Sequence, residues 1–150
     1  MSFEFALRDA GLNGFNLVPV SSILPPRCKV ITREEGLSHI VPGEIVFCVL
    51  SKNSSKVKGR RILSAVGCAI PNDPSKVGYI SEYKSSEDEL QGMLTAKKLA
   101  IEMYESANGE KPKEVIGISK EAVVDENEIW TTVVTAAVFI TNMEKEYEQI

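Results

Sequence analysis

The sequence predicts an α+β fold with antiparallel sheets. Segments that read as strands outnumber those that read as helices, and most neighbouring strands are joined by hairpin-type turns. The chain has 150 residues, of which 43% are hydrophobic and 25% charged, a composition typical of a globular domain that buries a core. Because no repeat or linker divides it, we expect a single domain over residues 1–150.

The first predicted element is a helix over residues 2–12. Gly11 is a typical C-terminal stop. Glu4 and Arg8 lie one turn apart on the polar edge, where such residues usually form a solvated ion pair. The apolar face carries residues at helical spacing, namely Phe3, Ala6, Leu7 and Ala10.

Residues 16–26, NLVPVSSILPP, read as a short apolar strand that runs into two serines and then two prolines. Pro25 and Pro26 cannot donate backbone hydrogen bonds, so the strand must leave its sheet there, and Ser21 and Ser22 sit at the end of a rigid element. Serines at a strand end usually bond to nearby backbone. Alternatively, the Ser22 hydroxyl attacks the Ser21 carbonyl, and the resulting ester breaks down through dehydroalanine to a pyruvoyl group. The pattern alone leaves both open.

Apolar runs predict six further strands and a second helix. The helix opens at a capping box, Ser86 with Glu89, and runs to about residue 107, before Asn108 and Gly109. The lysine-rich segment 52–59 reads as an exposed hairpin loop, and the tail over residues 144–148 as solvated. The predicted strands cover residues 28–31, 44–50, 61–70, 77–83, 114–124 and 128–141.

Glu82 is a candidate acid in the strand over residues 77–83. Alternation places it on one face with Gly78 and Ile80, which favours partial burial. Burial would keep the carboxyl protonated at neutral pH, as a general acid must be. An ordinary edge-strand carboxylate is the alternative.

Charge and hydropathy exclude several classes of function. A net charge of -4 and a pI of about 5.2 argue against nucleic-acid binding, and the basic run over residues 56–61 is too short to oppose this. The longest apolar run, 133–140, is too short to span a bilayer and no leader is recognised, so we expect a cytoplasmic protein. Cys28, Cys48 and Cys68 lack metal-site spacing, so we expect reduced, mostly buried thiols and no metal.

Three stretches, in order, resemble the pyruvoyl-dependent arginine decarboxylases. They are FEFALRDAGLNGFNLVPVSSILPP, AIPNDPSKVGYISEY and IWTTVVTAAVFI, which begin at residues 3, 69 and 129. The most specific part is the SSILPP core with its upstream asparagine and the downstream G-x-x-x-E. The resemblance covers essentially the whole chain. It implies a four-layer αββα sandwich, as in the pyruvoyl-dependent histidine and arginine decarboxylases, assembled as a trimer with active sites between subunits.

The resemblance also implies self-processing. The chain would be cut between Ser21 and Ser22 into residues 1–21 and 22–150, and the larger piece would begin with a pyruvoyl group derived from Ser22, with no metal. Through a Schiff base on that group, L-arginine would lose carbon dioxide and yield agmatine, a step in polyamine biosynthesis.

The same resemblance implies roles for individual residues. Asn16, otherwise a turn-capping amide, would stabilise the oxyanion during self-cleavage, and Glu82 would donate the proton that completes decarboxylation. Glu4 would bind the guanidinium of the substrate, since a carboxylate matches its planar fork. The aliphatic stem would be lined by Leu7, Phe15 and Ile80.

Two departures from that family leave other hypotheses open. Members usually carry a glycine-containing strand upstream of the segment that begins at Phe3, and glycine or another small or acidic residue often stands where this chain has Arg27. One alternative is therefore an N-terminally shortened, uncleaved relative that serves as a non-catalytic assembly partner. Another is a pyruvoyl decarboxylase of a different amino acid.

Overall fold

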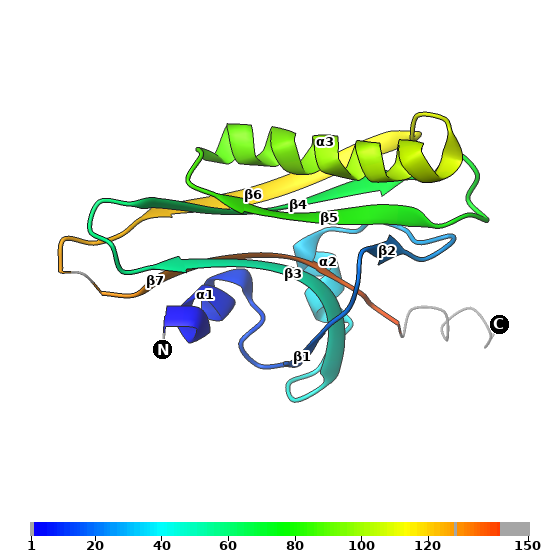
Figure 1. Ribbon diagram of the computed structural model, residues 1–150. Helices are drawn as coiled ribbons and strands as arrows, with labels where there is room; N and C mark the ends of the chain where they lie inside the picture. The colour runs from blue at the N-terminus through cyan, green and yellow to red at the C-terminus, as the bar shows by residue number, and fades with distance from the viewer. Residues whose placement is uncertain (1, 128, 142–150) are drawn as a thin grey trace.

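The computed structural model describes residues 2–127 and 129–141, which form two facing sheets with helices on the outside (Figure 1). Sheet A has the strand order β1-β3-β7, and sheet B has the order β2-β5-β4-β6. The elements in chain order are α1 (Ser2–Ala10), β1 (Asn16–Pro19), β2 (Ile23–Leu24), α2 (Arg33–Ser38), β3 (Ile45–Ser55), β4 (Arg61–Ile70), β5 (Gly78–Ser85), α3 (Glu89–Asn108), β6 (Glu114–Val123) and β7 (Thr131–Val138).

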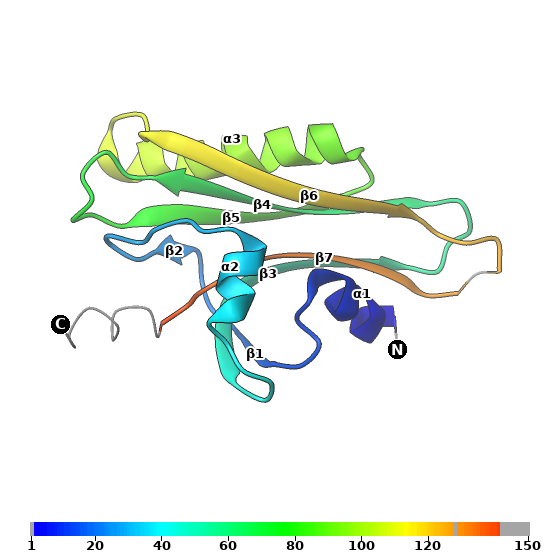
Figure 2. The ribbon, with the colours of Figure 1, turned by 180° about the vertical axis from the view of Figure 1, so that it is seen from behind.

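The layers follow the predicted order of helix, sheet, sheet and helix. The long helix α3 covers the outer face of sheet B, and α1 lies against the outer face of sheet A, as the front and back views show (Figures 1 and 2). A cluster formed by Leu24, Val49, Val66 and Ile80 fills the space between the sheets. The α+β sandwich expected from the sequence is therefore confirmed.

One strand pair departs from the antiparallel expectation. β1 runs parallel to β3, with Asn16 opposite Ile45 and Pro19 opposite Cys48, whereas every other described pair is antiparallel. The chain between these two strands passes through β2 and α2 instead of a hairpin. Such a crossover is what lets two neighbouring strands run in the same direction.

The segment after the double proline was predicted wrongly. Residues 28–31 form no strand, and the acidic stretch that follows is helix α2. The Cys28 N–H donates to the Pro25 carbonyl at 3.3 Å, which closes a turn, and Thr32 caps α2 by accepting from the Glu35 N–H at 3.2 Å. Within the turn, Arg27 has φ of 59°, a left-handed conformation that favours glycine.

Other boundaries shift by a few residues. β3 continues to Ser55, because β7 pairs with it along its length, and this shortens the predicted hairpin loop. α3 begins after Asp88, whose carboxylate accepts from the Gln91 N–H at 2.9 Å, so the expected capping box is wrong. Gly109 closes the helix with φ of 66°. Residue 128 and the tail over 144–148 lie outside the described residues.

Sheet B and α3 pack closely enough to require glycine. A Cβ on Gly67 would lie 2.2 Å from the Ala96 carbonyl oxygen, so no larger residue fits without moving the helix. In the part of the chain that the structure describes, no helix is long and apolar enough to cross a membrane.

The three cysteines are free thiols with different exposure. Cys48 is fully buried, Cys68 half-buried and Cys28 exposed. Burial is the main reason that the pKa of Cys68 rises to about 11. Cys28 is thus more accessible than the sequence suggested.

Candidate active site

The serine pair lies where the chain crosses from one sheet to the other. β1 ends at Pro19 in sheet A, and β2 begins at Ile23 in sheet B. Three residues, Val20, Ser21 and Ser22, make this crossing (Figure 1). The prolines were expected to end the strand, but the change of sheet occurs before them.

Main-chain hydrogen bonds hold both ends of the crossing. The Val20 N–H donates to the Cys48 carbonyl at 2.8 Å, and the Ile80 N–H donates to the Ser22 carbonyl at 2.8 Å. The Ser21–Ser22 peptide bond is therefore suspended between one anchor on sheet A and one on sheet B. Ser21 is exposed and Ser22 half-buried.

Neither serine hydroxyl hydrogen bonds to another group within the described residues, so both differ from the usual strand-end serine. A hydroxyl without a partner remains available to react. Fixing the backbone on both sides limits the positions that the Ser22 hydroxyl can take relative to the Ser21 carbonyl, which favours an intramolecular attack.

Ile80 and Glu82 share the face of β5 that is turned toward sheet A. The Ile80 side chain is 1% exposed in the core between the sheets. Glu82 is exposed, contrary to the predicted partial burial. The reason is that β2 pairs only with Gly78 and Tyr79, which leaves the next part of β5 uncovered.

Glu82 nevertheless lies on the serine side of the molecule. After burial, its negative charge is the second cause of the raised pKa of the Cys48 thiol. Cys48 is the residue whose carbonyl anchors Val20. Glu82 also lies two residues along β5 from Ile80, whose N–H binds the Ser22 carbonyl.

Asn16 is not directed at the serine pair of its own chain. Its Nδ2 donates to the Gly43 carbonyl at 2.9 Å, and its backbone N–H donates to the Glu44 carbonyl at 2.9 Å. The extended stretch from Asn16 to Val20 spans about 13 Å. Within one chain the Asn16 amide caps the turn before β3, as expected of a turn-capping asparagine.

The predicted substrate-binding residues fall into two groups. Leu7 is buried beneath α1, and Phe15 packs against the same cluster on the outer face of sheet A. Glu4 lies on α1 and pairs with Arg8 at 3.4 Å. Ile80 lies in the separate cluster between the sheets. Sheet A separates the two groups within one chain, so the predicted pocket is divided.

An exposed apolar surface near the serine pair was not foreseen. Its members come from β1, the crossing, β2 and β3, and each is 37% to 62% exposed: Val18, Val20, Ile23, Ile45 and Phe47. Monomeric proteins rarely leave large contiguous apolar surfaces uncovered. The only sign of this surface in the sequence is the apolar character of these segments, which is equally typical of buried strands.

The residues present fit a pyruvoyl group at position 22. Such a group keeps the main-chain carbonyl of residue 22, and the Ile80 N–H already binds this carbonyl. Half-burial of Ser22 beside an exposed Ser21 leaves room for an amine to approach. The described residues contain no group of side chains suited to a metal ion.

Comparisons with known proteins identify a single family. A family model described as pyruvoyl-dependent arginine decarboxylase matches residues 1–144. The chain is 54% identical over 141 residues to the pyruvoyl-dependent arginine decarboxylase of Methanocella arvoryzae, and 51% identical over 140 residues to pyruvoyl-dependent arginine decarboxylase 1 of Methanosarcina acetivorans. Each alignment covers 93% of this chain and 85% of the relative. A similar protein of Archaeoglobus fulgidus is 46% identical over 140 residues, with 93% of this chain and 87% of that protein covered.

Proposed function

Because the chain belongs to the pyruvoyl-dependent arginine decarboxylase family, we propose that it uses a pyruvoyl group to convert L-arginine to agmatine and carbon dioxide. The observation that carries the proposal is the Ser21–Ser22 peptide bond suspended between two sheets, with neither hydroxyl bonded to any of the described residues. Relatives named for this reaction match 93% of the chain, which favours it over a non-catalytic relative and over a different amino acid.

The pyruvoyl group would come from Ser22. The Ser22 hydroxyl attacks the Ser21 carbonyl and the peptide bond becomes an ester. Loss of the α-proton of residue 22 then breaks the bond between its Cβ and the ester oxygen, which releases Ser21 as a carboxylate and leaves dehydroalanine. Hydrolysis of dehydroalanine releases ammonia and leaves the ketone.

Both products of this cleavage would keep their place in the fold. Residues 1–21 contain α1 and β1, which are held by the cluster beneath α1 and by the pairing with β3. Residues 22–150 contain β2 to β7. A single cut therefore removes no strand from either sheet.

The chain's own residues would carry the remaining steps. When bound to an amine, the ketone supplies an electron sink for the loss of carbon dioxide. The Ile80 N–H holds the carbonyl of residue 22, and Glu82 delivers a proton to the α-carbon of the substrate. Glu4 binds the guanidinium through two oxygens once it exchanges Arg8 for the substrate.

A complete site requires a second copy of the chain. Leu7, Phe15 and Glu4 lie on the far side of sheet A from Ile80 in one chain, and Asn16 is turned away from its own Ser22. A neighbouring copy seated on the exposed apolar surface beside the serine pair would bring the two groups together. We propose a trimer, as the family resemblance implies, with each site built from two chains.

The test is an intact-mass spectrum with and without a hydrazine that traps ketones. Two fragments, 1–21 and 22–150, are expected, and only the larger gains the mass of the hydrazone. Ser22→Ala is the matched control and should give one intact chain that the reagent does not modify. An unprocessed, unmodified wild-type chain would contradict the proposal. Release of carbon dioxide from arginine, compared with lysine and ornithine, then tests the substrate.

A further inference from the structure

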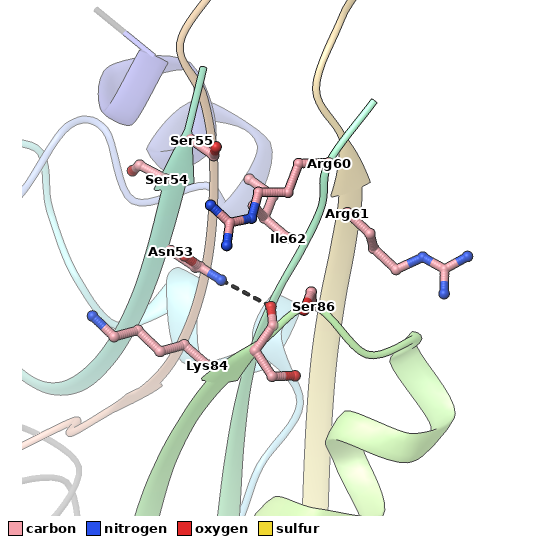
Figure 3. Close-up of a pocket in the computed structure, with 9 residues that line it drawn as sticks. Asn53, Ser54, Ser55, Arg60, Arg61, Ile62, Lys84 and Ser86 are labelled. Atoms are coloured by element: carbon pink, nitrogen blue, oxygen red, sulfur yellow. Dashed lines mark hydrogen bonds between the residues drawn. The ribbon is translucent and has the colours of Figure 1, made fainter. Parts of the chain in front are cut away.

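A cavity remote from the serine pair lies between the ends of the two sheets. Its volume is about 260 Å³. Figure 3 shows that residues of β3, β4 and β5 contribute its walls. The lining residues are Asn53, Ser54, Ser55, Arg60, Arg61, Ile62, Lys84, Ser85 and Ser86. None of these is acidic, although the chain carries a net charge of -4.

Two of the lining cations have no ionic partner among the described residues. Arg60 follows the hairpin loop and Lys84 lies on β5, and neither forms a salt bridge or a side-chain hydrogen bond there. In Figure 3 the Arg60 guanidinium points across the cavity toward Asn53. Both are exposed, and two cations without an ionic partner on the walls of one cavity create a positive potential that favours an anion there.

Arg61 differs from Arg60 both in having an ionic partner and in the direction of its side chain. Its guanidinium pairs with the Glu121 carboxylate at 3.6 Å, and Figure 3 shows its side chain pointing away from the cavity. The two arginines have the same charge and adjacent positions, but only Arg60 offers donors to the cavity. This contrast separates a specific site from a general positive surface.

The walls of the cavity are fixed by hydrogen bonds between the sheets. The Asn53 Nδ2 donates to the carbonyls of Leu63 and Ser85, both at 3.0 Å, and so ties sheet A to two strands of sheet B. The main chain of Arg60 is held by the residue that follows β6, because its carbonyl accepts from the Val124 N–H at 2.9 Å. The cavity therefore exists before any ligand binds.

From these observations we propose that the cavity binds a phosphate group, either free or as a monoester. A tetrahedral dianion has enough acceptor oxygens for the guanidinium of Arg60, the ammonium of Lys84 and the Ser86 hydroxyl, which has no partner among the described residues. A carboxylate carries a single negative charge and would balance only one of the two cations. The basic run over residues 56–61, which reads as a solvated loop in the sequence, thus supplies one side of a site.

The site is tested on the whole protein by thermal unfolding in inorganic phosphate, with sodium chloride at equal ionic strength as the reference. Because a ligand that binds the folded state raises the unfolding temperature, phosphate should raise it more than chloride does. Calorimetric titration should show binding weakened about fivefold or more in Arg60→Gln and in Lys84→Gln. Arg61→Gln, with the same loss of charge, should bind as the wild type does.

Equal effects of phosphate and chloride on the wild type would overturn the proposal. So would equal weakening in Arg60→Gln and Arg61→Gln, since that would indicate a general effect of charge. Glycerol phosphate distinguishes the two sources of the ligand. Tighter binding than that of inorganic phosphate would indicate a monoester, and weaker binding would indicate the free ion. These readouts do not depend on decarboxylation, so they stand apart from the test of the pyruvoyl group.

Discussion

At the scale of single residues, the serine pair is positioned by backbone groups and not by its own side chains. The anchors are the Cys48 carbonyl on one side and the Ile80 N–H on the other. A side-chain substitution at Ser22 therefore removes the nucleophile and leaves both anchors in place. This is why Ser22→Ala is a clean control for processing.

Glu82→Gln separates self-processing from turnover. Glutamine keeps the shape of the side chain but cannot deliver a proton as an acid does. Because the Glu82 side chain is exposed and makes no hydrogen bond in the described part of the chain, the fold should be unaffected. We expect normal fragments in the mass spectrum and a loss of about 100-fold or more in the rate of carbon dioxide release.

Full activity in Glu82→Gln would remove Glu82 from the mechanism. Lys84→Gln is a useful comparison, because Lys84 is the next residue on the same face of β5 and should leave decarboxylation unchanged.

At the scale of elements, the short pieces between β1 and β3 position the serine pair. β2 has two residues, yet its pairing with β5 carries the chain onto sheet B. The turn that follows requires a positive φ at Arg27, and the Arg27 N–H donates to the Pro74 carbonyl at 2.8 Å. The turn is therefore tied to the loop before β5, at the cost of an unfavourable backbone conformation.

Arg27→Gly should stabilise the protein. Glycine adopts this conformation without the penalty of about 1 kcal/mol that other residues incur, although its greater freedom in the unfolded chain offsets part of the gain. We expect the free energy of unfolding in urea to rise by roughly 0.5 kcal/mol. Lys29→Gly is the control, since Lys29 is exposed in the same loop and has an ordinary φ. A gain of the same size in the control would show that strain at Arg27 is not the cause.

The elements also show how far the sequence could be interpreted. β4, β5 and α3 have long periodic patterns, and their predicted positions agree with the structure to within a few residues. β2 and α2 are too short to show a periodic pattern. The two prolines indicate that a strand ends, but not that a turn joins β2 to α2. The Ile80 N–H lies 58 residues from Ser22, and no local pattern reports such a contact.

At the scale of the whole molecule, the divided pocket predicts complementation between chains. If each site takes Glu4 from one chain and Glu82 from its neighbour, Glu4→Ala and Glu82→Gln should each be inactive alone. When the two variants are co-expressed in equal amounts, about one quarter of the sites in randomly mixed trimers contain both native residues. Activity near that fraction of the wild type is the expected result.

A site built within one chain predicts the opposite outcome. Every chain in the mixture then lacks one of the two carboxylates, and no activity returns at any mixing ratio. Native mass spectrometry of the mixture, which separates trimers of different composition by mass, shows whether mixed oligomers have formed and keeps a negative result interpretable. Sequence patterns could not decide this question, because Leu7 and Ile80 both read simply as core residues.

A cut at the crossing between the sheets would make unfolding of the protein harder to reverse. Once the chain is cut there, α1 and β1 belong to a separate peptide that non-covalent contacts alone hold in place, among them packing, strand pairing and hydrogen bonds such as that from Asn16 to Gly43. Unfolding would let this peptide diffuse away, so refolding would become a second-order association that depends on concentration. The processed protein would keep its shape for as long as it stays folded, but it would lose the ability to regain that shape unaided after dilution.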